Sequence, residues 1–232
     1  MTLKEVIDIH NEENFIFAIA VGADSPGFNH ASIIYKWKDK IKVLDFYSGK
    51  IRKDCAYGDL GNKDYIYVQY NQDSIFYDFA IQIPVICEAI AEKQTLLNFG
   101  ITYNNSTFDK EGNLLLQTSD YGLTCATFVL SIFESAGITL INLDSWKSRE
   151  EDLEWQKYVL NFFINNKKIA SEDLIKHFES NLGCFRFRPE EVAAASSFDV
   201  LPSNFELCEV HGILLCKAID NGVVWFNESQ VS

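Results

Sequence analysis

The chain has 232 residues, of which 47% are hydrophobic and 14% aromatic, so it is long enough to bury one large core or two small ones. Its formal net charge of −13 disfavours nucleic acids and anionic membranes as partners, because both present negative charge. The first residues lack the basic start and apolar stretch of a signal peptide, and no window approaches the roughly 18 uninterrupted apolar residues of a membrane span. We therefore expect a soluble, cytoplasmic protein without integral membrane association.

Six cysteines are dispersed along the chain, with no CxxC pair and no cysteine and histidine cluster at the spacing of zinc ligands. They are Cys55, Cys87, Cys125, Cys184, Cys208 and Cys216. We therefore expect neither disulfides nor structural zinc.

Hydrophobic periodicity predicts strands in the first third of the chain, after a short amphipathic helix over residues 3–10. The strands are expected over residues 14–22, 30–38, 41–49 and 63–70. Residues 74–94 are predicted to form a long helix, bent near Pro84 because proline lacks a backbone donor.

The remaining chain predicts mainly helices. Residues 98–122 are turn-rich and are expected to carry short strands. Helices are expected from about Cys125, over residues 149–165 and 171–181, and after Pro189. Residues 205–227 are predicted to form strands, with Asp220-Asn221-Gly222 as a turn. The chain is therefore expected to be α+β, and without repeats or linkers residues 1–232 are expected to form a single domain.

The stretch DYGLTCATFVLSIFESAGI places Cys125 at the start of an apolar helix. Thr124 or Asp120 can cap this helix, and Gly137 is a typical residue just past its last turn. A cysteine at the first helical position meets unpaired N–H groups and the positive end of the helix dipole, which stabilise a thiolate. Position alone leaves two interpretations open: a nucleophile, or a small buried core residue.

A nucleophilic cysteine needs a base and an orienting group from elsewhere in the chain. Of the four histidines, His10, His177 and His211 are expected in exposed helical or turn positions. His30 is the best candidate because it begins a strand after a turn, where its side chain can face a cleft. Asp45 is a carboxylate among apolar residues and needs a partner.

The register of the hairpin decides whether Asp45 can reach His30. If Lys36-Trp37-Lys38-Asp39 form the loop, Asp45 lies directly opposite His30. If Asp39-Lys40 form a two-residue turn, Asp45 pairs with Ile34, roughly 13 Å from His30 along the strand. The sequence leaves both registers open.

Three stretches resemble the YiiX-like, circularly permuted branch of the NlpC-type papain-fold cysteine hydrolases, in which the histidine strand precedes the cysteine helix. NHASIIYKWKDKIKVLDF is similar to the strand with the histidine and the strand with the acid, FGITYNNSTF to a Gly-x-x-Tyr-Asp/Asn segment, and YGLTCATFVLSIFESAGI to the nucleophile helix. RFRPEEVAAA is similar to a Pro-acid-hydrophobe helix near the end of such domains. The resemblance implies a permuted papain-like fold, with an antiparallel sheet packed against the helix that bears the nucleophile.

The resemblance also implies roles for individual residues. Cys125 would be the nucleophile, His30 the base and Asp45 the orienting group of a hydrolase that cleaves a peptide or protein amide through a thioester. The Cys125 backbone N–H would stabilise the oxyanion, with Tyr103 or Asn104 as a second donor or as cleft wall. This chemistry requires no metal and no organic cofactor.

Two residues depart from the family pattern: Ala126 follows the nucleophile where serine is common, and Asp45 stands where glutamate is frequent. Residues 141–181 have no counterpart in the family and are expected to form a helical insertion over the cleft. Two other functions remain open. One is a lipid acyltransferase or esterase, as in the related lecithin:retinol acyltransferase-like proteins, and the other is an inactive papain-fold binding module.

Overall fold

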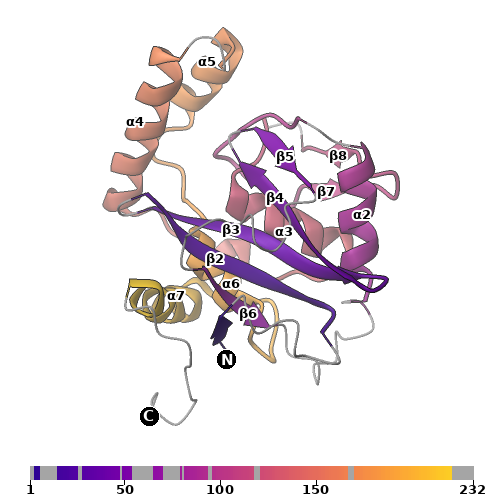
Figure 1. The fold of residues 1–232 in the computed structure, drawn as a ribbon. Helices are drawn as coiled ribbons and strands as arrows, with labels where there is room; N and C mark the ends of the chain where they lie inside the picture. The colour runs from indigo at the N-terminus through magenta and orange to yellow at the C-terminus, as the bar shows by residue number, and fades with distance from the viewer. Residues whose placement is uncertain are drawn as a thin grey trace.

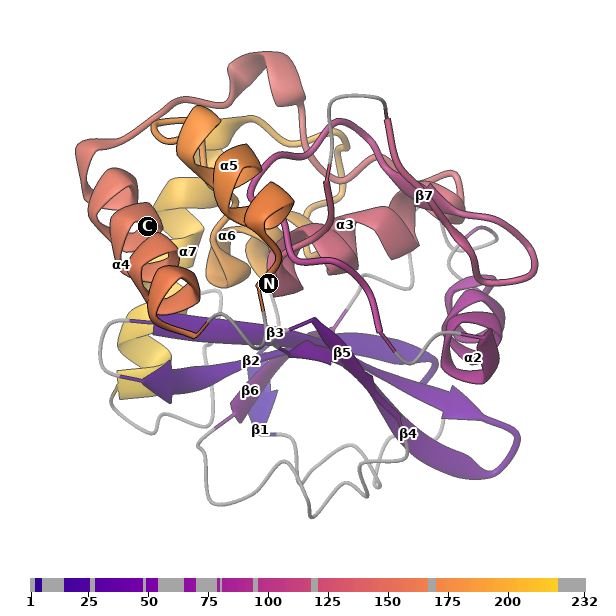
Figure 2. The same ribbon diagram turned by 90° about the horizontal axis from the view of Figure 1, so that it is seen from above.

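The computed structural model describes residues 3–5, 15–25, 28–47, 49–53, 65–69, 79, 81–93, 96–117, 121–166 and 170–220. The fold is α+β, as predicted: an antiparallel sheet forms one layer, and helices α2, α3 and α6 lie along one face of it (Figures 1 and 2). The side chains between the sheet and these helices form the main hydrophobic core.

The sheet has six strands in the order β1-β6-β2-β3-β4-β5. The strands are β1 (Leu3–Glu5), β2 (Phe17–Ser25), β3 (Phe28–Trp37), β4 (Lys40–Tyr47), β5 (Lys50–Arg52) and β6 (Tyr65–Gln69). The four strands predicted over residues 14–22, 30–38, 41–49 and 63–70 are confirmed as β2, β3, β4 and β6. The central strands are buried on both faces, which explains their nearly continuous apolar sequences.

The predicted helix over residues 3–10 is wrong at its start, because Leu3–Glu5 form the edge strand β1. This strand pairs with β6, with Leu3 opposite Val68 and Glu5 opposite Ile66. A short isolated helix is marginal in water, so hydrogen bonding to a neighbouring strand outweighs the amphipathic pattern. Residues 6–10 lie outside the described part.

Helix α3 (Cys125–Ser135) confirms the helix predicted to begin at Cys125. Thr124 is the N-cap and forms a capping box with Thr127, while Gly137 has a φ of +76° just past the C-cap. The buried stripe of the helix lies on the sheet: the ring of Phe128 is 5.6 Å from that of Phe46. These contacts fix the position of the first residue of α3.

Within the described residues, Phe79 is helical, residues 81–82 form a turn, and helix α2 (Ile83–Lys93) begins at Ile83, so the helix predicted over residues 74–94 is interrupted just before Pro84 where a bend was expected. Pro84 occupies the first turn, where its missing N–H would have no partner in any case. Residues 74–78, 80 and 94 lie outside the described part. The short strands expected in the turn-rich region are β7 (Thr107–Phe108) and β8 (Leu114–Leu115), which pair with each other.

Helices α4 (Glu150–Asn165) and α5 (Glu172–Ser180) confirm the two predicted helices and stand together beside the sheet (Figure 1). They follow the 3-10 turn η3 (Leu143–Ser145). Their facing sides enclose a second, smaller apolar cluster centred on Phe163 and Phe178, whose rings are 5.9 Å apart.

Helix α6 (Pro189–Ala195) begins at Pro189 as predicted, but the strands predicted over residues 205–227 are wrong where the chain is described. Phe205–Asp220 form one helix, α7, and His211 therefore lies on a helix and not between strands. The buried positions of α7 recur every three or four residues, which is the helical period. They are Phe205, Cys208, Gly212, Leu215, Ala218 and Ile219. Residues 221–227, which include Asn221 and Gly222 of the predicted turn, lie outside the described part.

Two leucine substitutions on α7 test this correction. Leu215 is fully buried whereas Leu207 is 43% exposed, although in a strand the two side chains would share one face. Leu215→Ala should lower the free energy of unfolding by about 2–5 kcal/mol because it leaves a cavity. Leu207→Ala should change it by about 0.5 kcal/mol or less. Urea unfolding measures both, and equal losses would contradict the helix.

Candidate active site

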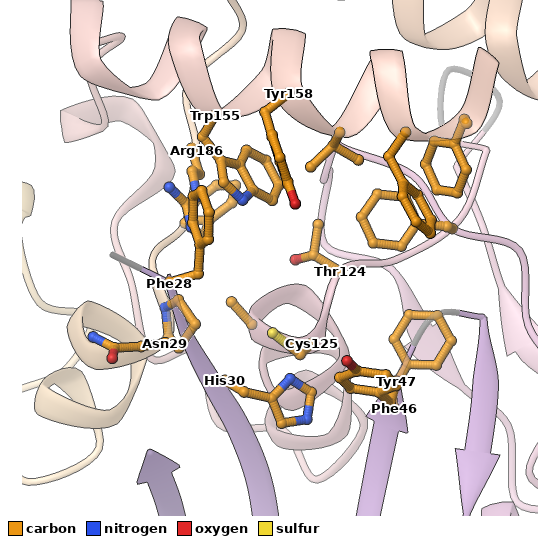
Figure 3. A pocket seen from close by; sticks show the side chains of 17 residues that line it. Phe28, Asn29, His30, Phe46, Tyr47, Thr124, Cys125, Trp155, Tyr158 and Arg186 are labelled. Carbon is orange, nitrogen blue, oxygen red and sulfur yellow. The ribbon is translucent and has the colours of Figure 1, made fainter. Parts of the chain in front are cut away.

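The structure brings together Cys125, His30 and Asp45 from three different elements. Cys125 is the first residue of α3, His30 lies on β3 and Asp45 on β4. His30 and Asp45 are buried, while Cys125 is partly exposed at the bottom of a cleft. Figure 3 shows the Cys125 sulfur above the His30 ring. The three residues form a continuous polar path from the sheet to the cleft.

The hairpin between β3 and β4 has neither of the two registers considered from the sequence. Its turn is Lys38-Asp39, and Ser32 lies opposite Asp45. His30 and Asp45 are therefore diagonal neighbours on one face of the sheet, a separation that long side chains can bridge. His30 Nε2 contacts Asp45 Oδ1, and the Ser32 hydroxyl donates to the same oxygen at 3.2 Å.

A fourth residue, Arg52, completes the surroundings of Asp45 and was missed by the sequence analysis. Arg52 lies on β5 directly opposite Asp45. Its Nε donates to Asp45 Oδ2 at 2.6 Å, and its Nη2 contacts the same oxygen. Its guanidinium also lies over the Tyr47 ring, 4.5 Å from the centroid. The need of Asp45 for a partner was visible in the sequence, but identifying Arg52 required the β4–β5 register.

The charges of this cluster alternate. Burial would raise the pKa of Asp45, but hydrogen bonding to His30 and the charges of His30 and Arg52 hold that pKa below its usual value. Burial would likewise lower the pKa of His30, yet Cys125 and Asp45 outweigh it and raise that pKa. Because Nε2 is engaged by Asp45, Nδ1 is the ring nitrogen left to face Cys125.

The surroundings of Cys125 favour the ionised form of its thiol. Burial would raise its pKa, but the charge and hydrogen bond of His30, together with a backbone hydrogen bond from Ala31, lower it. Four other cysteines in the described part, Cys87, Cys184, Cys208 and Cys216, have a pKa raised by burial. Among these five cysteines, Cys125 is thus the one whose surroundings lower the pKa of its thiol.

The first turn of α3 offers N–H donors beside the sulfur. Thr124 Oγ1 accepts from the Thr127 amide at 3.2 Å, and the Thr124 carbonyl accepts from Phe128 at 2.9 Å. The amides of Cys125 and Ala126 make no hydrogen bond to any other described residue. Both can donate to an oxyanion formed next to the Cys125 sulfur.

The structure places Tyr103 and Asn104 away from the cleft. Tyr103 is buried in the main core, where its ring packs against Phe187 at 5.5 Å. Asn104 is exposed, and neither residue lines the cleft. Their predicted role as a second oxyanion donor or as cleft wall therefore has no support in the geometry. The Ala126 amide is better placed for the first of these roles.

The cleft has a volume of about 370 Å³ and is largely aromatic. Its floor carries His30, Phe46, Tyr47, Thr124 and Cys125. Helix α4 forms the opposite wall with Trp155, Tyr158, Val159, Phe162 and Phe163 (Figure 3). Phe28 and Arg186 close one end beside Trp155. Helix α4 belongs to the segment 141–181 that was expected to cover the cleft, but its individual lining residues had no signal in the sequence.

No family model matches the chain, and no curated protein or solved structure matches it significantly. No helix within the described ranges is long and apolar enough to cross a membrane. The described residues also contain no group of three or more His, Cys, Asp and Glu side chains that could hold a metal ion.

The pairing of Arg52 with Asp45 can be tested by measuring the free energy of unfolding at two pH values. Arg52→Ala leaves a buried carboxylate with one cationic partner fewer, so at pH 7 we expect a loss of about 1–2 kcal/mol. This is below the value for a fully buried pair because the Arg52 side chain is 45% exposed.

The lowered pKa of Asp45 means that its contribution is present above the unfolded value and is lost as the pH falls through the folded value. The difference between wild type and variant in urea unfolding should therefore shrink between pH 7 and about pH 3. The exposed neighbour Lys50→Ala is the control and should differ little from wild type at either pH. A loss for Arg52→Ala that is independent of pH would contradict the pairing.

Proposed function

We propose that the protein is a thiol-dependent hydrolase that cleaves an amide bond of a peptide or protein through a thioester intermediate, on a permuted papain-like fold of the NlpC type. The observation that carries the proposal is the contact of a helix-terminal Cys125 with His30, which in turn contacts Asp45, at the bottom of a cleft. The chain order His30, Asp45, Cys125 also agrees with the YiiX-like family that the sequence resembles.

The geometry supports acyl transfer in two steps. The Cys125 thiolate attacks the carbonyl carbon, a C–S bond forms, and the carbonyl oxygen becomes an oxyanion that accepts from the amides of Cys125 and Ala126. His30 Nδ1–H then protonates the amide nitrogen as the C–N bond breaks and the amine leaves. Water, deprotonated by His30, attacks the thioester and releases the carboxylic acid and the thiolate. Asp45 keeps Nε2–H in place throughout and stabilises the imidazolium.

An ester or acyltransferase substrate with a lipid chain is a second candidate, which the aromatic lining of the cleft favours. The same cysteine and histidine would act, with an alcohol as the leaving or accepting group. Short-chain and long-chain activated esters compared with peptide amides, each followed by the mass of the acyl-enzyme, separate the two candidates.

The primary test is the rate of Cys125 alkylation by iodoacetamide as a function of pH, followed by peptide mapping. Cys125 should react fastest of all cysteines, with an apparent pKa below the roughly 8.5 of a free thiol. His30→Ala should abolish this advantage, and Asp45→Asn should reduce it, because each weakens the ion pair that stabilises the thiolate. The buried Cys87 and Cys208 are internal references. If Cys125 reacts no faster than these residues in the folded protein, the proposal fails.

The rate of turnover should fall on both the acid and the alkaline side of its pH profile, whereas the rate of alkylation should fall on the acid side alone. The acid limit is the lowered pKa of Cys125, because a protonated thiol cannot attack. The alkaline limit is the raised pKa of His30, because neutral imidazole cannot protonate the leaving amine. Activity that kept rising with pH past the point where His30 loses its proton, as measured by NMR, would exclude His30 as the acid.

A further inference from the structure

A largely buried cation on the wall of the cleft has no role in the proposed chemistry. The Arg186 side chain is 13% exposed, and its guanidinium carbon lies 3.9 Å from the centre of the Trp155 ring. Figure 3 shows Arg186 beside Trp155 and Phe28, across the cleft from Cys125 and His30. A substrate bound to Cys125 therefore has Arg186 within the same cleft.

The guanidinium of Arg186 donates no hydrogen bond to any other described residue. Its nearest carboxylate oxygen is Oδ1 of Asp152, at 3.7 Å from Nη1, which is beyond hydrogen-bonding range. That carboxylate is already engaged: Oδ1 accepts from Arg188 Nε at 3.0 Å and Oδ2 from Arg149 Nε at 2.7 Å. Three arginines thus share one carboxylate, and Arg186 is the one without a bond to it.

Arg149, a neighbouring arginine, differs from Arg186 because its guanidinium donates to several carboxylate oxygens. Arg149 contacts both oxygens of Glu191 in addition to Asp152, and these partners outweigh burial and raise its pKa. Burial lowers the pKa of Arg186, and the attraction of Asp152, Glu190 and Cys125 does not offset it. Glu190 itself accepts from Asn29 at 3.0 Å. Arginine has five donors in a planar fork, so its buried side chain is left with donors for a ligand.

We propose that Arg186 binds a carboxylate of the substrate, and that an aromatic or other apolar group of the same substrate packs between α4 and Phe28. This inference rests on the proposed function, since it concerns the molecule that Cys125 attacks. A planar guanidinium pairs with a carboxylate through two parallel hydrogen bonds. Apart from His30, Arg186 is the one cationic residue among the described residues that line the cleft. A ligand group with a single negative charge therefore fits the site better than a phosphate dianion.

Two matched alkylating probes test the inference: N-bromoacetyl-phenylalanine and N-bromoacetyl-phenylalanine amide. Both carry the same ring and the same electrophile, whose bromide is displaced as the Cys125 sulfur forms a C–S bond, and they differ in one carboxylate. Labelling of Cys125 is followed by mass spectrometry, and each rate is divided by the rate of the same probe with a neutral model thiol. In wild type the acid should label Cys125 about tenfold faster than the amide, the gain expected of one charge-assisted pair.

Substitutions assign this preference to Arg186. Arg186→Gln should bring the acid-to-amide ratio close to that of the model thiol, and Arg186→Lys should keep part of the preference because it keeps the charge without the fork. Lys157→Gln is the control, since it removes one positive charge from an exposed position on α4 and should leave the ratio as in wild type. Circular dichroism of each variant verifies its fold.

A measurement without variants covers the case in which Arg186→Gln does not fold. 3-Phenylpropanoate should protect wild-type Cys125 from iodoacetamide at concentrations about tenfold lower than 3-phenylpropanamide does. Equal labelling of Cys125 by both probes, or equal protection by both compounds, would overturn the carboxylate inference and leave the hydrolase proposal intact. A Cys125 that is labelled no faster than the other cysteines by either probe would instead overturn the proposed function.

Discussion

The buried charge of Asp45 is the constraint on which the sheet and the site both depend. An unpaired carboxylate in this position would cost several kcal/mol, so Asp45 requires cationic and hydrogen-bonding partners. They come from the strands on either side, with His30 and Ser32 on β3 and Arg52 on β5. A shift of either neighbouring strand by one residue would turn these partners to the opposite face. The registers of β3, β4 and β5 therefore also determine that His30 lies next to Cys125.

Charge alternates along the path from the protein surface to the cleft. Arg52 is half exposed, Asp45 is buried, His30 is buried, and Cys125 opens to the cleft. Each group favours the ionised form of the next, which is why the pKa of His30 is raised while those of Asp45 and Cys125 are lowered. The free N–H groups at the start of α3 add to the stabilisation of the thiolate. Arg52, at the exposed end of the path, thus favours the ionised form of Cys125 at the cleft through Asp45 and His30.

Local signals in the sequence were sufficient to predict Cys125, His30 and Asp45 as candidate site residues. The pairing of strands, which depends on residues far apart in the sequence, was not predictable. The N-cap residue Thr124, the apolar stripe and Gly137 predicted the helix that begins at Cys125. The position of Asp45 among apolar residues indicated that it needs a partner. The register was not predictable, because the turn places Lys38 at a φ of 56°, a conformation for which lysine gives no signal. Arg52 became identifiable only with that register. Helix α7 was mistaken for strands because Leu207, Val210 and Ile213 are apolar although they lie outside its buried stripe, so the helical period is obscured.

The wall of the cleft that carries Arg186 is held in place by its neighbours and not by the Arg186 side chain. Gln156 on α4 accepts from the Gly183 amide and donates to the Cys184 carbonyl, both at 2.7 Å. The Arg186 carbonyl accepts from Trp146 Nε1 at 3.0 Å, and Arg188 is bonded to Asp152 of α4. Hydrogen bonds to α4 therefore hold the chain on both sides of Arg186, through the backbone of Gly183 and Cys184 on one side and the Arg188 side chain on the other.

Because the chain is held in this way, the guanidinium keeps its place in the cleft although it donates no hydrogen bond to any residue that the structure describes. The guanidinium carbon of Arg186 lies 3.9 Å from the centre of the Trp155 ring, and this contact uses none of the five N–H donors. A side chain held by its neighbours loses little conformational entropy when it binds, so the donors remain available at low cost for a ligand. The same logic applies to the amides of Cys125 and Ala126, which the capping of α3 by Thr124 leaves without a partner among the described residues. On both sides of the cleft, the hydrogen bonds that fix the structure are made by residues adjacent to the groups that face the cleft.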